Sequence, residues 1–65
     1  MKSVNFVRYL REHNCYPYRE GGSHTIVMNK LNKKISSIPR HKEIKNNLVK
    51  KICKDLEVPE PSSFQ

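Results

Sequence analysis

The chain has 65 residues, so it forms one domain with a thin hydrophobic core and no room for a deep substrate cleft. Its 13 lysines and arginines outnumber 6 aspartates and glutamates, which gives a formal net charge of +7. This excess favours a polyanionic partner, nucleic acid first, through phosphate contacts and counterion release. A membrane is excluded as a partner, because the apolar runs are short and no basic helix carries a wide apolar face.

The cysteines and the first residues favour a reducing, cytoplasmic setting. Cys15 and Cys53 lie far apart and belong to no CxxC pair, so a disulfide framework or a zinc knuckle lacks its usual spacing. The opening segment MKSVNFVRYL lacks the apolar stretch of a signal peptide. We therefore expect a cytoplasmic protein.

The first predicted element is an amphipathic helix over residues 4–13, with Ser3 as its N-terminal cap. Its apolar residues recur on one side at helical spacing: Val4, Phe6, Val7 and Leu10. Asn14 follows where a left-handed residue is needed, a conformation that asparagine tolerates. The chain is therefore expected to turn back at Asn14.

Three antiparallel strands are predicted next. CYPYRE contains Pro17, which cannot donate to a ladder, so this segment is expected to be an edge strand that ends at two glycines. HTIVMN is rich in β-branched residues, and KISSI forms a third strand closed by Pro39. Ile26 and Met28 alternate with Val27, so both sheet faces carry apolar side chains. A face without helices then offers an apolar patch to a protein partner.

A second helix, capped by Asn46, closes the predicted domain. Its apolar stripe comprises Leu48, Val49, Ile52, Cys53 and Leu56. The domain is expected to span residues 1–56, followed by a flexible tail over residues 57–65, which are rich in proline and serine. The order αβββα predicts an α+β fold in which two helices cover one face of a three-stranded antiparallel sheet, as in double-stranded-RNA-binding domains.

The segment GGSH carries the candidate chemistry. Gly21 and Gly22 remove side chains from a turn beside His24, so a phosphate backbone can approach main-chain N–H groups, and Ser23 adds a hydroxyl donor. Histidine exchanges protons near neutral pH. RNA cleavage by the 2′-hydroxyl needs a base, an acid and cations, but no metal. The alternative interpretation of this segment is a plain hairpin turn.

Metal-dependent and covalent chemistry have less support in the sequence. Two-metal phosphoryl transfer needs clustered carboxylates, whereas Asp55 is the only aspartate and the five glutamates are scattered. The three histidines share no metal-ligand spacing, and Cys53 lies on the apolar stripe. We therefore expect no metal, no cofactor and no small-molecule ligand.

The segment PRHKEIK surrounds His41 with three cations: Arg40, Lys42 and Lys45. Such a run is either a solvated loop or an RNA contact, and the sequence leaves both open. The second proton-transfer role of an RNA-cleaving site is also left open between His41, a lysine, water and no group at all. His13, at the end of the first predicted helix, is instead expected to interact with the helix dipole.

The segments GGSH, SSIPRHKEIK and LVKKICKDL, in this order and spacing, resemble the HicA toxins of bacterial type II toxin–antitoxin systems. The resemblance reaches from the first helix to Leu56. It implies a ribosome-independent mRNA interferase with a double-stranded-RNA-binding-domain-like fold, neutralised by a HicB-type antitoxin that covers the active face. The family's catalytic histidine corresponds to His24, with Gly22 and Ser23 shaping the turn. RNA binding by the basic residues 39–45 is inferred from charge alone.

The chain departs from the family pattern at two turns. Many relatives have glycine and an aromatic residue where this chain has Asn14 and Cys15, and many have glycine and threonine in place of Asn46 and Asn47. These departures leave turn geometry and partner fit open. Two other functions also remain open: a non-catalytic RNA- or DNA-binding module, and a protein-interaction subunit that meets an acidic partner.

Overall fold

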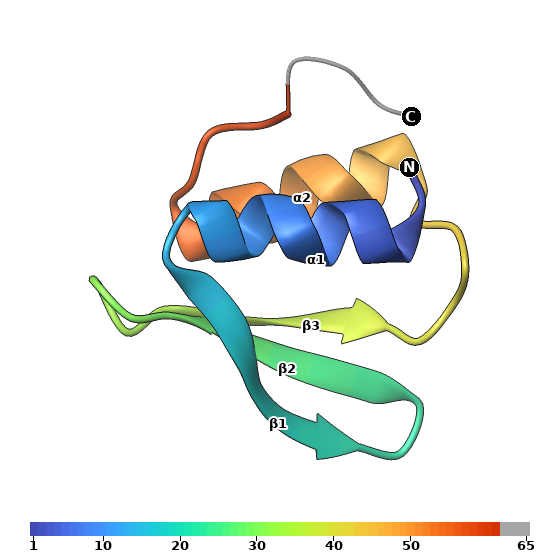
Figure 1. Ribbon diagram of the computed structural model, residues 1–65, viewed down its shortest axis with the longest axis horizontal. Coiled ribbons are helices and arrows are strands. Elements are labelled where there is room, and N and C mark those ends of the chain that lie inside the picture. Colours follow the sequence, from blue (N-terminus) through green and yellow to red (C-terminus); the bar gives the residue numbers. More distant parts are fainter. Residues whose placement is uncertain (62–65) are drawn as a thin grey trace.

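The computed structural model describes residues 1–61, and the elements follow in the order α1 (Ser3–Glu12), β1 (Cys15–Gly21), β2 (His24–Asn29), β3 (Ile35–Pro39) and α2 (Asn46–Leu56). The strands pair antiparallel in the order β1–β2–β3. Both helices lie side by side over one face of this sheet (Figure 1). The predicted α+β fold and its αβββα order are therefore confirmed. Neither helix has the length and apolarity needed to span a membrane.

The hydrophobic core lies between the helices and the sheet face that they cover. It comprises ten buried residues: Phe6, Leu10, Cys15, Val27, Ile38, Ile44, Val49, Ile52, Cys53 and Leu56. Along β2, Val27 and Asn29 are buried, whereas the alternate residues Ile26 and Met28 are only half-buried. Because side chains alternate along a strand, His24 points away from the helices together with Ile26 and Met28.

The helix starts differ from the prediction, because neither Ser3 nor Asn46 acts as a cap. Each is the first helical residue, and the preceding Lys2 and Lys45 have extended backbones without a side-chain capping bond. The start of α1 is held instead by the chain before α2, where the carbonyl of Lys42 accepts a hydrogen bond from the N–H of Ser3 at 2.8 Å. Pairing between two distant segments therefore replaces a local cap.

The turn after α1 and the segment after α2 pack against the domain. Asn14 adopts the predicted left-handed conformation, with φ 68°. Val58 packs against the core, and the hydroxyl of Tyr9 donates a hydrogen bond to the carbonyl of Pro59. The flexible tail over residues 57–65 stays a prediction, and its last four residues, 62–65, lie outside the described part of the chain.

Asn29 is the one buried polar side chain among residues 1–61, with 4% of its surface exposed. Its Nδ2 donates to the carbonyl of Leu56 at the end of α2, at 2.9 Å. Its Oδ1 accepts from the N–H of Leu31 in the β2–β3 turn, also at 2.9 Å. This side chain therefore joins the end of β2, the following turn and the C-terminus of α2.

We predict that Asn29→Ala lowers the free energy of unfolding by about 1–3 kcal/mol, because it removes two hydrogen bonds of a buried side chain, one to the Leu56 carbonyl and one from the Leu31 N–H. Asn32→Ala is the matched control, since Asn32 donates to the same Leu56 carbonyl, at 3.2 Å, from a more exposed position. Urea denaturation followed by circular dichroism measures both losses. Equal losses for the two variants would contradict the role given to Asn29.

Candidate functional site

The β1–β2 turn places His24 at the first position of β2, opposite Gly21 on one side and Pro39 on the other. Gly22 has φ +27°, a region that disfavours residues with a Cβ, so glycine suits this turn. The imidazole is exposed, and its Nδ1 lies 3.2 Å from the hydroxyl oxygen of Ser23. This contact engages Nδ1 and leaves Nε2 for a substrate.

A β-bulge in β1 brings a cation to the same face as His24. The register shifts between Pro17 and Arg19, so that Arg19 rather than Tyr18 lies opposite Ile26. Residues directly opposite each other in an antiparallel pair share a face, so Arg19 points away from the helices with Ile26 and His24. An open hollow of about 470 Å³ beside the imidazole is lined by Arg19, Gly21, Gly22, Ser23, His24 and Ile26.

Sequence reasoning missed Arg19. Simple alternation along CYPYRE places Arg19 on the helix side, because it counts every residue of the strand. A signal was present in Pro17, which cannot donate to a ladder and is tolerated at bulges. The same alternation would place Tyr16 and Tyr18 on one side of β1, and the bulge interrupts it. Both tyrosines are exposed.

Arg40 reaches the turn from the end of β3. Its backbone N–H donates to the carbonyl of Ser23 at 3.0 Å, and its Nη1 donates to the carbonyl of Gly22 at 3.4 Å. The same Nη1 lies 3.5 Å from Oε1 of Glu20, and the Arg40 and Glu20 side chains are 53% and 62% exposed. An ion pair this exposed adds little stability. The structure therefore brings Gly22, Ser23, His24 and Arg40 together.

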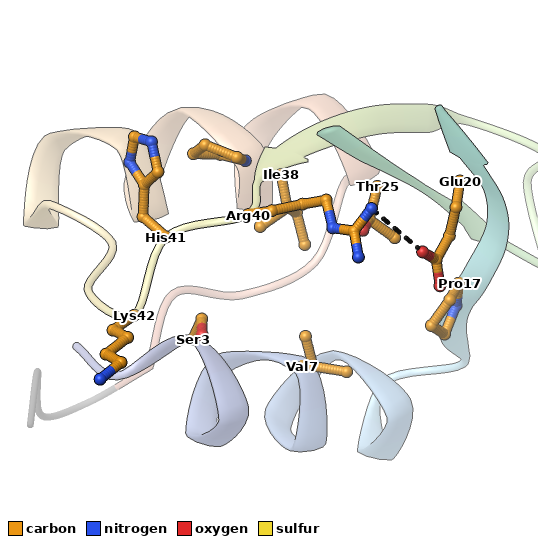
Figure 2. A pocket seen from close by; sticks show the side chains of 10 residues that line it. Ser3, Val7, Pro17, Glu20, Thr25, Ile38, Arg40, His41 and Lys42 are labelled. Carbon is orange, nitrogen blue, oxygen red and sulfur yellow. Dashed lines mark ion pairs between the residues drawn. The ribbon is translucent and has the colours of Figure 1, made fainter. Parts of the chain in front are cut away.

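Lys42 and Lys45 lie farther along the chain and make no contact with the turn in the described structure. The carbonyl of Lys42 pairs with the start of α1, and Lys45 immediately precedes α2. Both side chains are exposed, as is that of His41. In Figure 2 the imidazole of His41 points away from α1, on the other side of the loop from Lys42. These residues extend the positive surface without joining His24.

His13 and the two cysteines lie outside the site. The Nδ1 of His13 is 3.0 Å from the carbonyl of Tyr9 at the end of α1, which agrees with the predicted helix-terminal role. Cys15 and Cys53 are free and buried. Burial, with a smaller contribution from Glu60, raises the pKa of the Cys53 thiol to about 11, so it stays protonated and unreactive. Within residues 1–61, no three His, Cys, Asp or Glu side chains form a group that could hold a metal ion.

A comparison of the sequence with models of protein families shows to which family the chain belongs. A model described as the HicA toxin of bacterial toxin–antitoxin systems matches residues 5–58, which is most of the chain. The chain belongs to the HicA toxin family. It is therefore the toxin of a toxin–antitoxin system, which implies an antitoxin partner, and HicA toxins as a family cleave RNA. No match is found among curated proteins or among solved structures.

The structure accommodates the departures of this HicA chain from the family pattern. Asn14 adopts a left-handed backbone conformation that glycine supplies readily and that asparagine tolerates. Cys15 fills a buried core position with 1% of its surface exposed. Asn46 and Asn47 form the exposed first turn of α2. None of these residues lines the hollow beside His24.

Proposed function

We propose that this HicA toxin is a metal-independent endoribonuclease that cleaves mRNA in the cytoplasm, with His24 as its proton-transfer group. One observation carries the proposal: the imidazole is exposed on the face of the sheet that the helices leave open, beside a hollow lined by a glycine turn and Arg19. The net charge of +7 favours an RNA substrate. The free, unpaired cysteines are consistent with a reducing compartment.

In the proposed reaction the 2′-oxygen of one ribose attacks the adjacent phosphorus while the bond from phosphorus to the 5′-oxygen breaks. The 2′-hydroxyl loses its proton, and the leaving 5′-oxygen gains one. The products are a 2′,3′-cyclic phosphate and a 5′-hydroxyl end. His24 supplies one of the two proton transfers through Nε2, while Ser23 holds Nδ1. In this proposal water carries out the other transfer.

The arginines around the turn have different roles in this proposal. Arg19 shares the face of His24, so its guanidinium stabilises the negative charge that develops on the phosphorane oxygens. Arg40 is held against the Gly22 carbonyl and contacts the RNA strand beside the cleaved phosphate. Lys42 and Lys45 attract the phosphate backbone from farther away, which adds affinity without adding chemistry.

We predict that His24→Ala lowers the cleavage rate of a labelled RNA by about 10²–10⁴-fold, the usual contribution of a general acid or base. The exposed position of His24 predicts an unchanged thermal unfolding midpoint. The assay contains EDTA, and growth after induction is followed in parallel. His41→Ala is the control, because His41 has no contact with the turn in the described structure, and it should cleave normally.

The outcome also separates the competing functions. Wild-type protein that binds RNA in EDTA and leaves it intact would indicate the alternative, a non-catalytic RNA- or DNA-binding module. A His24→Ala variant that cuts at the wild-type rate would remove His24 from the mechanism. A wild-type protein that neither binds RNA nor slows growth would indicate a pure protein-interaction subunit.

We predict that Arg19→Gln lowers the cleavage rate by about 10-fold or more, with a smaller loss of RNA affinity, because Arg19 contributes chiefly in the transition state. Arg8→Gln is the matched control, since Arg8 is an exposed arginine on α1, on the other side of the sheet. Single-turnover cleavage and RNA binding are measured for both variants. Equal effects on rate and affinity for Arg19→Gln would show a purely electrostatic contribution to binding.

We also propose that a HicB-type antitoxin binds the open face of the sheet. Tyr16, Met28 and Ile35 lie opposite one another on the three strands and form a cross-strand row, which we call the apolar row. Ile35 is 53% exposed and Tyr16 38%. The apolar row lies on the same face as His24, and the positive charge of the toxin favours an acidic partner. An antitoxin on this face therefore covers the imidazole as well.

We predict that Ile35→Asp weakens binding to the cognate antitoxin by about 10-fold or more, because it places a carboxylate in an apolar contact facing an acidic partner. Leu31→Asp is the control, since Leu31 is 72% exposed in the β2–β3 turn, outside the apolar row. Binding is measured by titration calorimetry with the inactive His24→Ala background. Equal losses for both variants would place the antitoxin elsewhere.

A further inference from the structure

A second hollow lies on the other side of the sheet, between α1, the end of β1 and the loop after β3 (Figure 2). Its volume is about 390 Å³, within the range of small-ligand pockets. Its walls are apolar: Val7 from α1, Pro17 from β1, and Ile38 and Pro39 from β3. Polar and charged residues complete the lining: Ser3, Glu20, Thr25, Arg40, His41 and Lys42. We call this the α1 hollow.

The α1 hollow contains an acceptor as well as donors. The bulge that turns Arg19 outward places the next residue, Glu20, opposite Thr25, and both of these residues line the hollow. Figure 2 shows the Arg40 side chain extending across the hollow toward the Glu20 carboxylate. Their 3.5 Å separation and high exposure leave both groups able to exchange partners. The hollow therefore offers a guanidinium donor and a carboxylate acceptor side by side.

This combination selects one class of occupant. A bare anion is repelled by Glu20, and a purely apolar side chain offers Arg40 and Glu20 no hydrogen bonds in place of those to the water that it displaces. A planar ring that carries both donors and acceptors on its edge satisfies both groups, while its faces contact Val7 and Pro17. Unpaired RNA bases are recognised in this way, by contacts to their faces and by hydrogen bonds to their Watson–Crick edges.

Arg40 also connects the α1 hollow to the turn that carries His24. Its backbone N–H binds Ser23 and its guanidinium binds the Gly22 carbonyl, so the hollow begins where the turn ends. A single RNA strand that crosses the turn beside His24 therefore continues toward the hollow. Lys42, at its far end, is exposed and available to the phosphate backbone.

We infer that the α1 hollow binds one unpaired base of the RNA strand next to the cleaved phosphate, and that its preferred base is guanine. The Watson–Crick edge of guanine has one carbonyl acceptor and two adjacent N–H donors. Arg40 donates to the acceptor and the Glu20 carboxylate, which only accepts, receives the two donors. Adenine offers this carboxylate one exocyclic donor only. The inference rests on the RNA substrate proposed above and adds a base preference to it.

Binding to short RNAs in the uncleaving His24→Ala background tests this inference. The probes are fluorescein-labelled uridine octamers that carry a single central guanine or a single central adenine, followed by fluorescence anisotropy. We expect the guanine probe to bind at least about fivefold more tightly, the lower end of discrimination by a bidentate side-chain–base pair. Glu20→Gln should abolish this difference, because the amide presents one acceptor in place of a carboxylate.

A second variant tests the inference by filling the α1 hollow with a large side chain. Val7→Trp places a large ring in the hollow and should remove the guanine preference, whereas the control Val4→Trp should keep it, since Val4 is 63% exposed on α1 and does not line the hollow. Equal affinity for the two probes in the His24→Ala background, or a preference that survives Val7→Trp, would overturn the inference. Glu20→Gln decides the matter if Val7→Trp fails to fold, because Glu20 is exposed.

The inference and the proposed nuclease activity fail in different ways. If the His24→Ala protein shows no guanine preference, the base-binding inference fails, while cleavage by the wild-type protein is measured separately and still tests the nuclease proposal. A wild-type protein that leaves RNA intact but still discriminates guanine would overturn the nuclease proposal and retain the base-binding hollow.

Discussion

The register of β2 is the constraint on which the rest of the molecule depends. Val27 and Asn29 point toward the helices, where Val27 joins the core and Asn29 binds the last carbonyl of α2. Strand geometry then directs His24 to the opposite face. A slip of one residue in β2 would turn His24 toward the helices and bury Met28 in place of Val27. The same packing that stabilises the fold thus exposes the imidazole.

The bulge in β1 determines which face of the sheet Arg19 and Glu20 occupy. Without it, Arg19 would face the helices and Glu20 the open side. With it, Arg19 lies on the face of His24 and Glu20 lies opposite Thr25, beside the α1 hollow. Because Tyr18 has no partner in the register, the Arg19 side chain lies at the proposed cleavage site and the Glu20 side chain lies at the proposed base site. Removing the bulge would exchange these two environments.

Sequence patterns predicted those features that depend on local periodicity. The helical stripe of α2, the strand HTIVMN and the left-handed Asn14 are confirmed because each reflects spacing or backbone preference within a few residues. The expected caps at Ser3 and Asn46 were wrong because each is the first helical residue, one position inside the helix, and at α1 pairing with a distant segment replaces a local cap. The position of Arg19 depends on a register shift, for which Pro17 was the one local signal, and the α1 hollow depends on contacts between elements that are distant in the sequence.

The sheet is one strand layer thick, and it separates the imidazole from the α1 hollow. A protein seated on the open face would occlude the imidazole while the hollow, on the side of the helices, stays accessible to solvent. The proposed cleavage site and the proposed base site can therefore be covered independently of each other.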